Sequence, residues 1–242
     1  MYIKVYENNG RAKTCAELVS RADLPLYIKG VELLPVPTRP DSPSLGDGGL
    51  YALLDGDCEG VVFAGYDIPP DVALRVLEGG GILLDSSLDE AFLLENAYLT
   101  SLGALGYILH SLGDAERPRV GVVGYGRIGS YLVKMLLSLG IDVRVFTGQK
   151  KTRLELGEMD IESSEYGEGA DFYGLDLLVN TAPARTVVPP QGLVVFDLAS
   201  GDNFDGTHVR KLPALPAKLY PVAAGKVWAK SIIRRFGAGE EG

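Results

Sequence analysis

Three glycines in the spacing Gly-x-Gly-x-x-Gly are the residues of this sequence whose arrangement points most directly to chemistry. Gly124, Gly126 and Gly129 follow a β-branched run at 120–123 and precede a segment with the apolar periodicity of a helix. A second β-branched run at 143–146 comes next, so the glycines lie between the strand and the helix of a predicted βαβ unit. In that context the backbone can approach a diphosphate group, and the motif predicts a dinucleotide site.

Each glycine of the motif has its own expected role. Gly124 permits the tight turn, Gly126 lets the backbone approach the diphosphate, and Gly129 allows the helix to pack closely on the strand. The N–H groups of Arg127 and Ile128, at the start of the helix, are the donors that we expect at the diphosphate. A glycine turn that is needed only for packing is the alternative interpretation of the same residues.

The end of the second strand indicates which dinucleotide binds. A site for NAD usually carries an acidic residue about 20 residues after the motif, where it binds the ribose 2′-hydroxyl, whereas a 2′-phosphate needs cations instead. Thr147 occupies this position, and Lys150, Lys151 and Arg153 follow before the first acid, Glu155. The sequence therefore favours NADP over NAD as the cofactor. The alternative is that these cations belong to a solvated helix start.

Two further apolar runs predict buried strands, and each is followed by residues suited to ligand binding. In open α/β sheets, ligands bind outside the carboxyl ends of the strands. We therefore expect Thr181, Ala182 and Pro183 to line the nicotinamide and its ribose, and Ser200 to bind a substrate carboxylate. A proline-terminated strand and a helix N-cap, respectively, are the structural alternatives.

General acid and base candidates are few. His110 falls on an apolar helical segment and His208 follows a loop, and neither stands at a predicted strand end. No Ser-His-Asp or Cys-His arrangement can be assembled from the sequence. Arg185 and Lys226 are cations near the predicted cleft that could hold an acidic substrate, although an ordinary surface charge explains each of them equally well.

Composition narrows the function classes. The chain has 242 residues, 46% of them hydrophobic, and a net charge of −9, so nucleic acid and anionic membrane surfaces are not expected partners. Cys15 and Cys58 stand alone, which predicts neither a disulfide scaffold nor a metal site. The N-terminus lacks the apolar core of a signal peptide, and we expect no membrane span and a cytoplasmic location.

The order of apolar runs predicts an α/β protein with two domains. Residues 1–90 would form a small β/α domain, and residues 91–117 a bridging helix that could break near Thr100. Residues 118–224 would form a Rossmann-type, doubly wound parallel sheet. Residues 225–242 would form a returning helix and a tail, and the substrate cleft would lie between the domains. Strands are also predicted at 26–28, 33–36, 159–161 and 218–222.

Four segments, in this order and spacing, resemble the A subunit of dipicolinate synthase: VGVVGYGRIGS, LDLLVNTAPA, VVFDLASG and LYPVAAGKVWAKSI. The segment NAYLTSLG, at 96–103, resembles the helix that leads into the cofactor domain of that family. The resemblance is most specific where Asp197-Leu198-Ala199-Ser200 is combined with Asn180-Thr181-Ala182-Pro183.

The resemblance implies an NADP-dependent oxidation of a dihydrodipicolinate-type ring to dipicolinate. The substrate would then be a small dicarboxylate, with Thr100 of the bridging segment among the residues that bind it. A flavoprotein-like B subunit is implied as a partner, and we expect a homo-oligomer. Such chemistry needs alignment at the nicotinamide and donors for two carboxylates more than it needs a strong base.

Two alternatives remain open at this point. The D-2-hydroxyacid dehydrogenases are similar in domain architecture, but they use a late histidine, and this chain has none after His208. A non-catalytic dinucleotide-binding module that regulates a partner enzyme would also explain the scarcity of acid and base candidates.

Overall fold

The structure, a computed structural model, describes residues 1–39, 41–42, 49–54, 56–167, 169–183, 189–199 and 208–237. The chain forms an N-terminal unit, Met1–Asn96 with Pro216–Gly242, and a central unit, Ala97–Leu215. The two units contain parallel sheets of four and six strands, respectively. The predicted class, an α/β protein with a Rossmann-type sheet and a smaller β/α domain, is confirmed.

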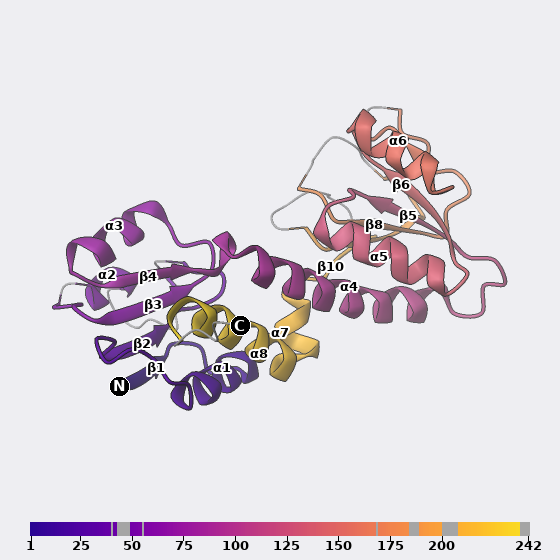
Figure 1. Cartoon of the computed structure of the whole chain (residues 1–242). Helices are drawn as coiled ribbons and strands as arrows, with labels where there is room; N and C mark the ends of the chain where they lie inside the picture. Colours follow the sequence, from indigo (N-terminus) through magenta and orange to yellow (C-terminus); the bar gives the residue numbers. More distant parts are fainter. Residues whose placement is uncertain are drawn as a thin grey trace. The chain divides into compact units, whose positions relative to one another are not determined.

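The sheet of the N-terminal unit has the strand order β1-β2-β3-β4 (Figure 1). Its strands are β1 (Tyr2–Val5), β2 (Gly30–Leu33), β3 (Val61–Gly65) and β4 (Ile82–Asp85). The helical elements of the unit are α1 (Gly10–Ser20), α2 (Gly49–Leu53), α3 (Pro70–Glu78), the 3-10 turn η2 (Ser86–Leu88), the start of α4 (Glu90–Leu112) and α8 (Pro221–Phe236). The short helix α7 (Leu215–Leu219) precedes α8.

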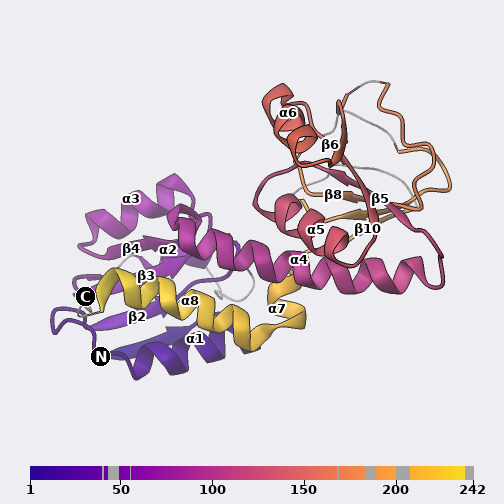
Figure 2. The same cartoon turned by 45° about the vertical axis from the view of Figure 1, so that its right-hand side comes forward.

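Helices α1 and α8 lie side by side in both views (Figures 1 and 2). A Cβ atom at Gly225 of α8 would lie 2.6 Å from the carbonyl oxygen of Arg11, so only glycine permits this approach. Trp228, one turn further on, is 1% exposed. The C-terminal helix is therefore part of the core of the N-terminal unit.

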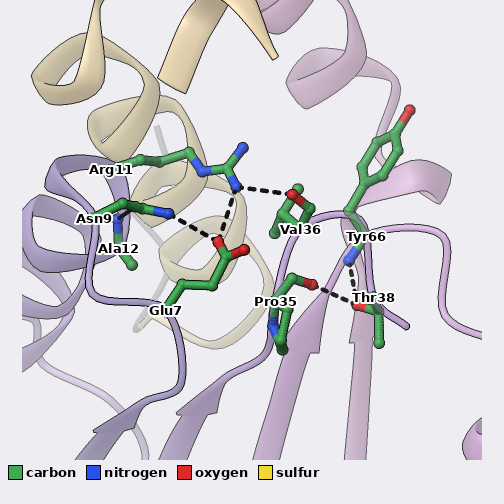
Figure 3. A network of polar contacts seen from close by, with 8 residues as sticks. All are labelled: Glu7, Asn9, Arg11, Ala12, Pro35, Val36, Thr38 and Tyr66. Carbon is green, nitrogen blue, oxygen red and sulfur yellow. Dashed lines mark hydrogen bonds and ion pairs between the residues drawn. The ribbon is translucent and has the colours of Figure 1, made fainter. Parts of the chain in front are cut away.

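A polar network joins the ends of β1, β2 and β3 (Figure 3). Arg11 Nη2 donates to Val36 O at 3.3 Å and lies 3.5 Å from Glu7 Oε2. The Thr38 hydroxyl donates to Pro35 O at 2.9 Å. Burial lowers the pKa of Arg11 below its ordinary value, although the Glu7 carboxylate acts in the opposite direction. The network fixes the loops at this edge of the sheet.

The central unit has the strand order β10-β9-β8-β5-β6-β7, with every pair parallel (Figure 2). Its strands are β5 (Arg119–Val123), β6 (Asp142–Phe146), β7 (Glu162–Ser164), β8 (Leu177–Asn180), β9 (Val194–Asp197) and β10 (Val209–Lys211). Its helices are α4 from Ala97 onwards, α5 (Arg127–Ser138) and α6 (Lys150–Glu158).

Successive residues of the central strands enter two separate cores. Val122 packs with Ile108 of α4 and Leu132 of α5, whereas Val123 packs with Phe146 and Phe172 in the other core. Because both faces are covered, strands β5 and β8 are apolar at almost every position, which is the pattern of a buried parallel sheet.

Several predicted elements were wrong. Residues 218–222 are not a strand, because Pro221 supplies the fixed φ of a helix start and α8 begins there instead of at Gly225. Residues 159–161 follow α6 as its C-cap Met159 and a turn through Asp160 at φ 55°, and strand β7 comes after them. Residues 26–28 form no strand, and β2 replaces the strand predicted at 33–36. Helix α4 continues through Thr100 without a break, and β10 was missed.

Within the described residues, α4 is the helix whose length and composition would suit a membrane span, with a mean hydropathy of 1.2 over its most apolar window. Ala104 and Ile108 of this helix are each 0% exposed and pack in the core of the central unit. These contacts identify α4 as a core helix of an α/β unit.

Candidate functional site

The carboxyl ends of β5 and β8 meet at the point where the order of the central sheet reverses. From β5 the chain proceeds to β6 on one side, while β8 pairs with β5 on the other, with Val123 opposite Asn180. Open α/β sheets bind their ligands at this kind of switch point. A pocket of about 620 Å³ lies here, lined by Val123, Gly124, Tyr125, Gly126, Phe146, Thr147, Gly148, Gln149, Thr152, Tyr166, Thr181, Ala182 and Pro183.

Two of the three motif glycines are required by packing. Gly124 has φ +89°, and a Cβ atom there would lie 2.9 Å from Thr181 Oγ1. A Cβ atom at Gly129 would lie 2.3 Å from the carbonyl oxygen of Gly124. A Cβ atom at Gly129 would push helix α5 away from the turn after β5, and a Cβ atom at Gly124 would press on Thr181 and Ala182 after β8. These two glycines therefore allow α5 and the segment after β8 to approach the turn closely.

Gly126 is different, because no packing contact requires it. Its φ of −81° and ψ of −161° are accessible to any residue, and among the described residues a Cβ atom there would meet no atom within 4 Å beyond its chain neighbours. The residue is the N-cap of α5 and provides no side-chain cap to the first turn of the helix. Packing alone therefore explains two of the glycines but not the third.

The segment after β8 forms one wall of the pocket and is held by buried polar contacts. The Thr181 hydroxyl donates to Val123 O at 2.8 Å, which ties the wall to β5. Asn180 is fully buried, and its Oδ1 accepts a hydrogen bond from the backbone N–H of Ala182 at 3.1 Å. Its Nδ2 donates to Asp197 Oδ1 at 2.8 Å. Thr181, Ala182 and Pro183 all line the pocket, as expected of residues that contact a ligand.

The opposite end of the pocket lies between β6 and α6. Thr147 is 8% exposed there, and Gln149 and Thr152 stand beside it in the lining. Gln149 is the N-cap of α6 and makes no side-chain cap bond, so a second helix N-terminus faces this end. Among the described residues of the lining there is no acidic side chain that could select a ribose 2′-hydroxyl.

The three predicted cations differ in their contacts. Arg153 donates to Thr147 O at 2.7 Å and is paired with Glu165 at 3.6 Å, so it braces the turn after β6. Lys151 lies 3.7 Å from Glu155 one turn along α6. Lys150 is exposed at the first position of α6, and no ion pair of this lysine occurs in the described part of the chain. Neither lysine belongs to the pocket lining itself.

Of the other predicted cofactor residues, Arg127 is exposed and Ile128 is half-buried, both in the first turn of α5. The two predicted substrate residues that the structure describes, Thr100 and Lys226, belong to different units. Thr100 is 8% exposed on the part of α4 in the central unit, whereas Lys226 is in the N-terminal unit, in a groove of about 500 Å³ between α1 and α8. Arg185 and Ser200 lie outside the described residues.

The sequence analysis missed seven lining residues: Val123, Tyr125, Phe146, Gly148, Gln149, Thr152 and Tyr166. All but Tyr166 lie at the end of β5 or β6 or within six residues after it, and this position was a signal that could have identified them. Tyr166 comes from an acidic stretch without periodicity, and only the fold brings it to the pocket. Burial, and to a lesser extent the charge of Glu155, raises the pKa of Tyr125.

Apart from the phenols of Tyr125 and Tyr166, acid and base groups are absent from the described lining of the pocket. It contains no histidine, cysteine, lysine or carboxylate. His110 is exposed on α4, and His208 directly precedes β10 at the amino end of that strand. Within the described ranges no three histidine, cysteine, aspartate or glutamate side chains are grouped so that they could hold a metal ion. The polar groups that the described lining offers are backbone groups, the hydroxyls of Thr147, Thr152 and Thr181, the two phenols and the amide of Gln149.

The strand order, read as β7-β6-β5-β8-β9-β10, together with the glycine turn after β5, defines a Rossmann-type dinucleotide-binding fold.

No model of a known protein family matches the sequence, and neither does any curated protein. The chain is similar in structure to the A subunit of dipicolinate synthase from Bacillus halodurans, with a TM-score of 0.76 and 18% identity over 97% of both chains.

A similar match is the dipicolinate synthase A chain from Bacillus subtilis, with a TM-score of 0.73 and 16% identity over 97% of this chain and 95% of that one. A D-lactate dehydrogenase from Treponema pallidum has a TM-score of 0.61 and 11% identity over 96% of this chain and 94% of that one. The expected resemblance to the A subunit of dipicolinate synthase is thereby confirmed at the level of the fold.

Proposed function

We propose that this protein is an NADP-dependent oxidoreductase whose dinucleotide binds in the pocket at the carboxyl ends of β5, β6 and β8. The observation that carries the proposal is Gly126, a glycine that no packing contact requires and that leaves the start of α5 open. A diphosphate at this place would accept hydrogen bonds from the N–H groups of Arg127 and Ile128. When bound, the nicotinamide would accept or supply two electrons and one hydrogen as hydride.

The proposed preference for NADP rests on the end of the pocket near α6. No carboxylate is among the described residues that line that end, and Glu155 and Glu165 nearby are paired with Lys151 and Arg153. The N-terminus of α6, the hydroxyls of Thr147 and Thr152, and the exposed ammonium of Lys150 would favour the phosphate. Lys151 would add a weaker contribution because it is shared with Glu155.

The proposed substrate is a dihydrodipicolinate-type ring, which would be oxidised to dipicolinate. The ring would lose a hydride to NADP⁺ and a proton to solvent, and aromatisation would drive the reaction. Support comes from the fold likeness to two dipicolinate synthase A chains over nearly their whole length, and from a pocket that offers alignment without an acid or base. A flavoprotein-like B subunit, a homo-oligomer and a cytoplasmic location are further parts of this proposal.

The test of this proposal is a titration of the purified chain with NADP⁺ and NAD⁺, monitored by calorimetry. We expect NADP⁺ to bind more tightly, and Lys150→Glu to weaken NADP⁺ about 10-fold or more while NAD⁺ is nearly unaffected, since the phosphate loses a cation and gains a like charge. Lys134→Glu, on the exposed side of α5, is the matched control and should change neither affinity. An absence of binding at millimolar cofactor would contradict the proposal.

A second candidate is a dinucleotide-binding module without catalytic activity. The observation that favours it is the lack of any titratable acid or base among the described lining residues, apart from the tyrosines. Turnover of a dihydrodipicolinate with NADP⁺ by the isolated chain would exclude this candidate. Turnover of a D-2-hydroxyacid instead would support the dehydrogenase alternative, for which the D-lactate dehydrogenase fold is the relevant likeness.

A further inference from the structure

Asp197 is a buried acidic residue whose carboxylate is linked to the pocket wall by hydrogen bonds. Asp197 ends β9, is 2% exposed, and belongs to the central unit, like the pocket. Its Oδ1 accepts hydrogen bonds from Asn180 Nδ2 at 2.8 Å and from the backbone N–H of Ala199 at 3.2 Å. The Asn180 side chain links the carboxylate, through two hydrogen bonds, to the N–H of Ala182, which lines the pocket.

The orientation of the Asn180 amide follows from its partners. Its oxygen must face the N–H of Ala182, and its nitrogen must face the carboxylate of Asp197. Both polar atoms of the Asn180 amide are therefore hydrogen-bonded, so the amide couples the position of β9 to that of the pocket wall at Ala182. Loss of the carboxylate would release the amide and, with it, the backbone that presents Ala182.

The second carboxylate oxygen of Asp197, Oδ2, takes no part in these hydrogen bonds. Its Oδ2 is buried and has no hydrogen-bond partner, and no cation pairs with Asp197 in the ranges that the structure describes. A buried carboxylate with one bare oxygen is costly for the folded chain unless a positive charge offsets it. The two side-chain hydrogen bonds of Asp197 both fall on Oδ1, and within the described ranges no cationic side chain is paired with its carboxylate.

We propose that Asp197 is a positioning residue whose buried charge favours the oxidised nicotinamide in the pocket. This inference rests on the proposed function, because it requires a nicotinamide dinucleotide to bind. In a Rossmann-type sheet each half binds one mononucleotide, and β8 to β10 form the half that follows the glycine motif. The nicotinamide would therefore lie beside the wall that Asp197 and Asn180 hold. The ring carries a positive charge only when it is oxidised, so a nearby carboxylate stabilises that form selectively.

The test is the ratio of the dissociation constants of NADP⁺ and NADPH, measured by calorimetry and by NADPH fluorescence on the full chain. We expect Asp197→Asn, which keeps the shape and removes the charge, to weaken NADP⁺ relative to NADPH by roughly 5- to 20-fold. Asp197→Glu should weaken both forms together and keep the ratio, because it moves the wall but retains the charge. If Asp197→Asn does not fold, Asp197→Ser makes the same prediction for the ratio.

Asp176→Asn is the matched control. This aspartate is exposed at the amino end of β8, where its Oδ2 accepts a hydrogen bond from Arg119 N at 2.8 Å, and its loss should leave the ratio unchanged. The inference would be overturned if Asp197→Asn weakened NADP⁺ and NADPH equally, or if Asp197→Asn and Asp176→Asn changed the ratio of the two dissociation constants alike. Either result would leave the proposed function intact. Failure of the wild-type chain to bind either form would instead overturn the proposed function.

Discussion

Replacing Gly126 with alanine should separate ligand binding from folding at this site. The new Cβ atom would meet no chain atom within 4 Å, and the φ of −81° suits alanine. Loss of glycine flexibility in the unfolded chain would stabilise the protein by about 0.4–1 kcal/mol, whereas alanine is a poorer N-cap than glycine by about the same amount. The two effects nearly cancel, so the melting temperature should stay close to that of the wild type.

Binding should respond strongly to the same change. The methyl group would occupy the open space in front of α5 and hold the diphosphate away from its N–H groups. One charge-assisted hydrogen bond is worth about 1.5–3 kcal/mol, and about 1.4 kcal/mol corresponds to a factor of ten. We therefore expect the affinity for NADP⁺ to fall roughly 10- to 150-fold, measured by calorimetric titration beside thermal unfolding.

Two other glycines provide the controls for this experiment. Gly129→Ala would place a Cβ atom 2.3 Å from the Gly124 carbonyl, so it should destabilise the chain by about 1–3 kcal/mol. Gly106→Ala, exposed on α4 with no atom within 4 Å, should stabilise the helix by up to about 1 kcal/mol and leave binding unchanged. A Gly126→Ala protein that unfolds like Gly129→Ala, or that binds NADP⁺ like the wild type, would refute the reasoning.

Three further predictions concern stability and pH. Gly225→Ala should destabilise the chain by about 1–3 kcal/mol in chemical unfolding, because its Cβ atom would meet a backbone carbonyl of α1 at 2.6 Å. Thr181→Val should cost about 1 kcal/mol and weaken cofactor binding, because the hydrogen bond to Val123 O is lost; unchanged binding would argue against a role for this wall. Burial and then the charge of Glu32 raise the pKa of Tyr2 to about 12 from its ordinary 10.0. The neutral Tyr2 phenol should therefore stabilise the folded chain fully below pH 10, and this stabilisation should be lost as the pH rises towards 12. Ultraviolet titration of Glu32→Gln should show the Tyr2 transition at lower pH, and an unchanged transition would exclude Glu32 as a cause.

The parts of the fold that local chemistry determines were predictable. Helix α3 occupies 70–78, where Pro70 suits the first turn and Gly79 follows the last residue of the helix. The unit from β5 to β6 was also predicted closely, since its two apolar runs, the spacing of its glycines and the periodicity of the segment between the runs all indicate the same strand-helix-strand unit. Six predicted cofactor residues, namely Gly124, Gly126, Thr147, Thr181, Ala182 and Pro183, line one pocket. That these residues bind a cofactor stays a prediction.

Elements that depend on distant contacts could not be predicted in this way. Strand β10 has only three residues, and its pairing with β9 at the edge of the sheet supplies the stability that its own sequence lacks. Tyr166 reaches the pocket through the fold, and nothing in its neighbourhood of sequence indicates this. The buried pairing of Asn180 with Asp197 needed the register of β8 on β9, in which these two residues are directly opposed.

The roles of charged residues were the hardest to predict, because sequence position does not show which charges are already paired. Arg153 was expected beside a cofactor phosphate together with Lys150 and Lys151, yet it binds the carbonyl of Thr147 and Glu165. Lys226 was expected near a substrate, and it lies in the groove between α1 and α8.

The most direct test of the central claim is a crystal structure of the chain grown with NADP⁺. We predict that the diphosphate oxygens lie within hydrogen-bond distance of the N–H groups of Arg127 and Ile128, over the open face of Gly126. The nicotinamide should lie beside Thr181 and Ala182. A dinucleotide bound elsewhere on the chain, or an empty pocket at saturating NADP⁺, would contradict the account.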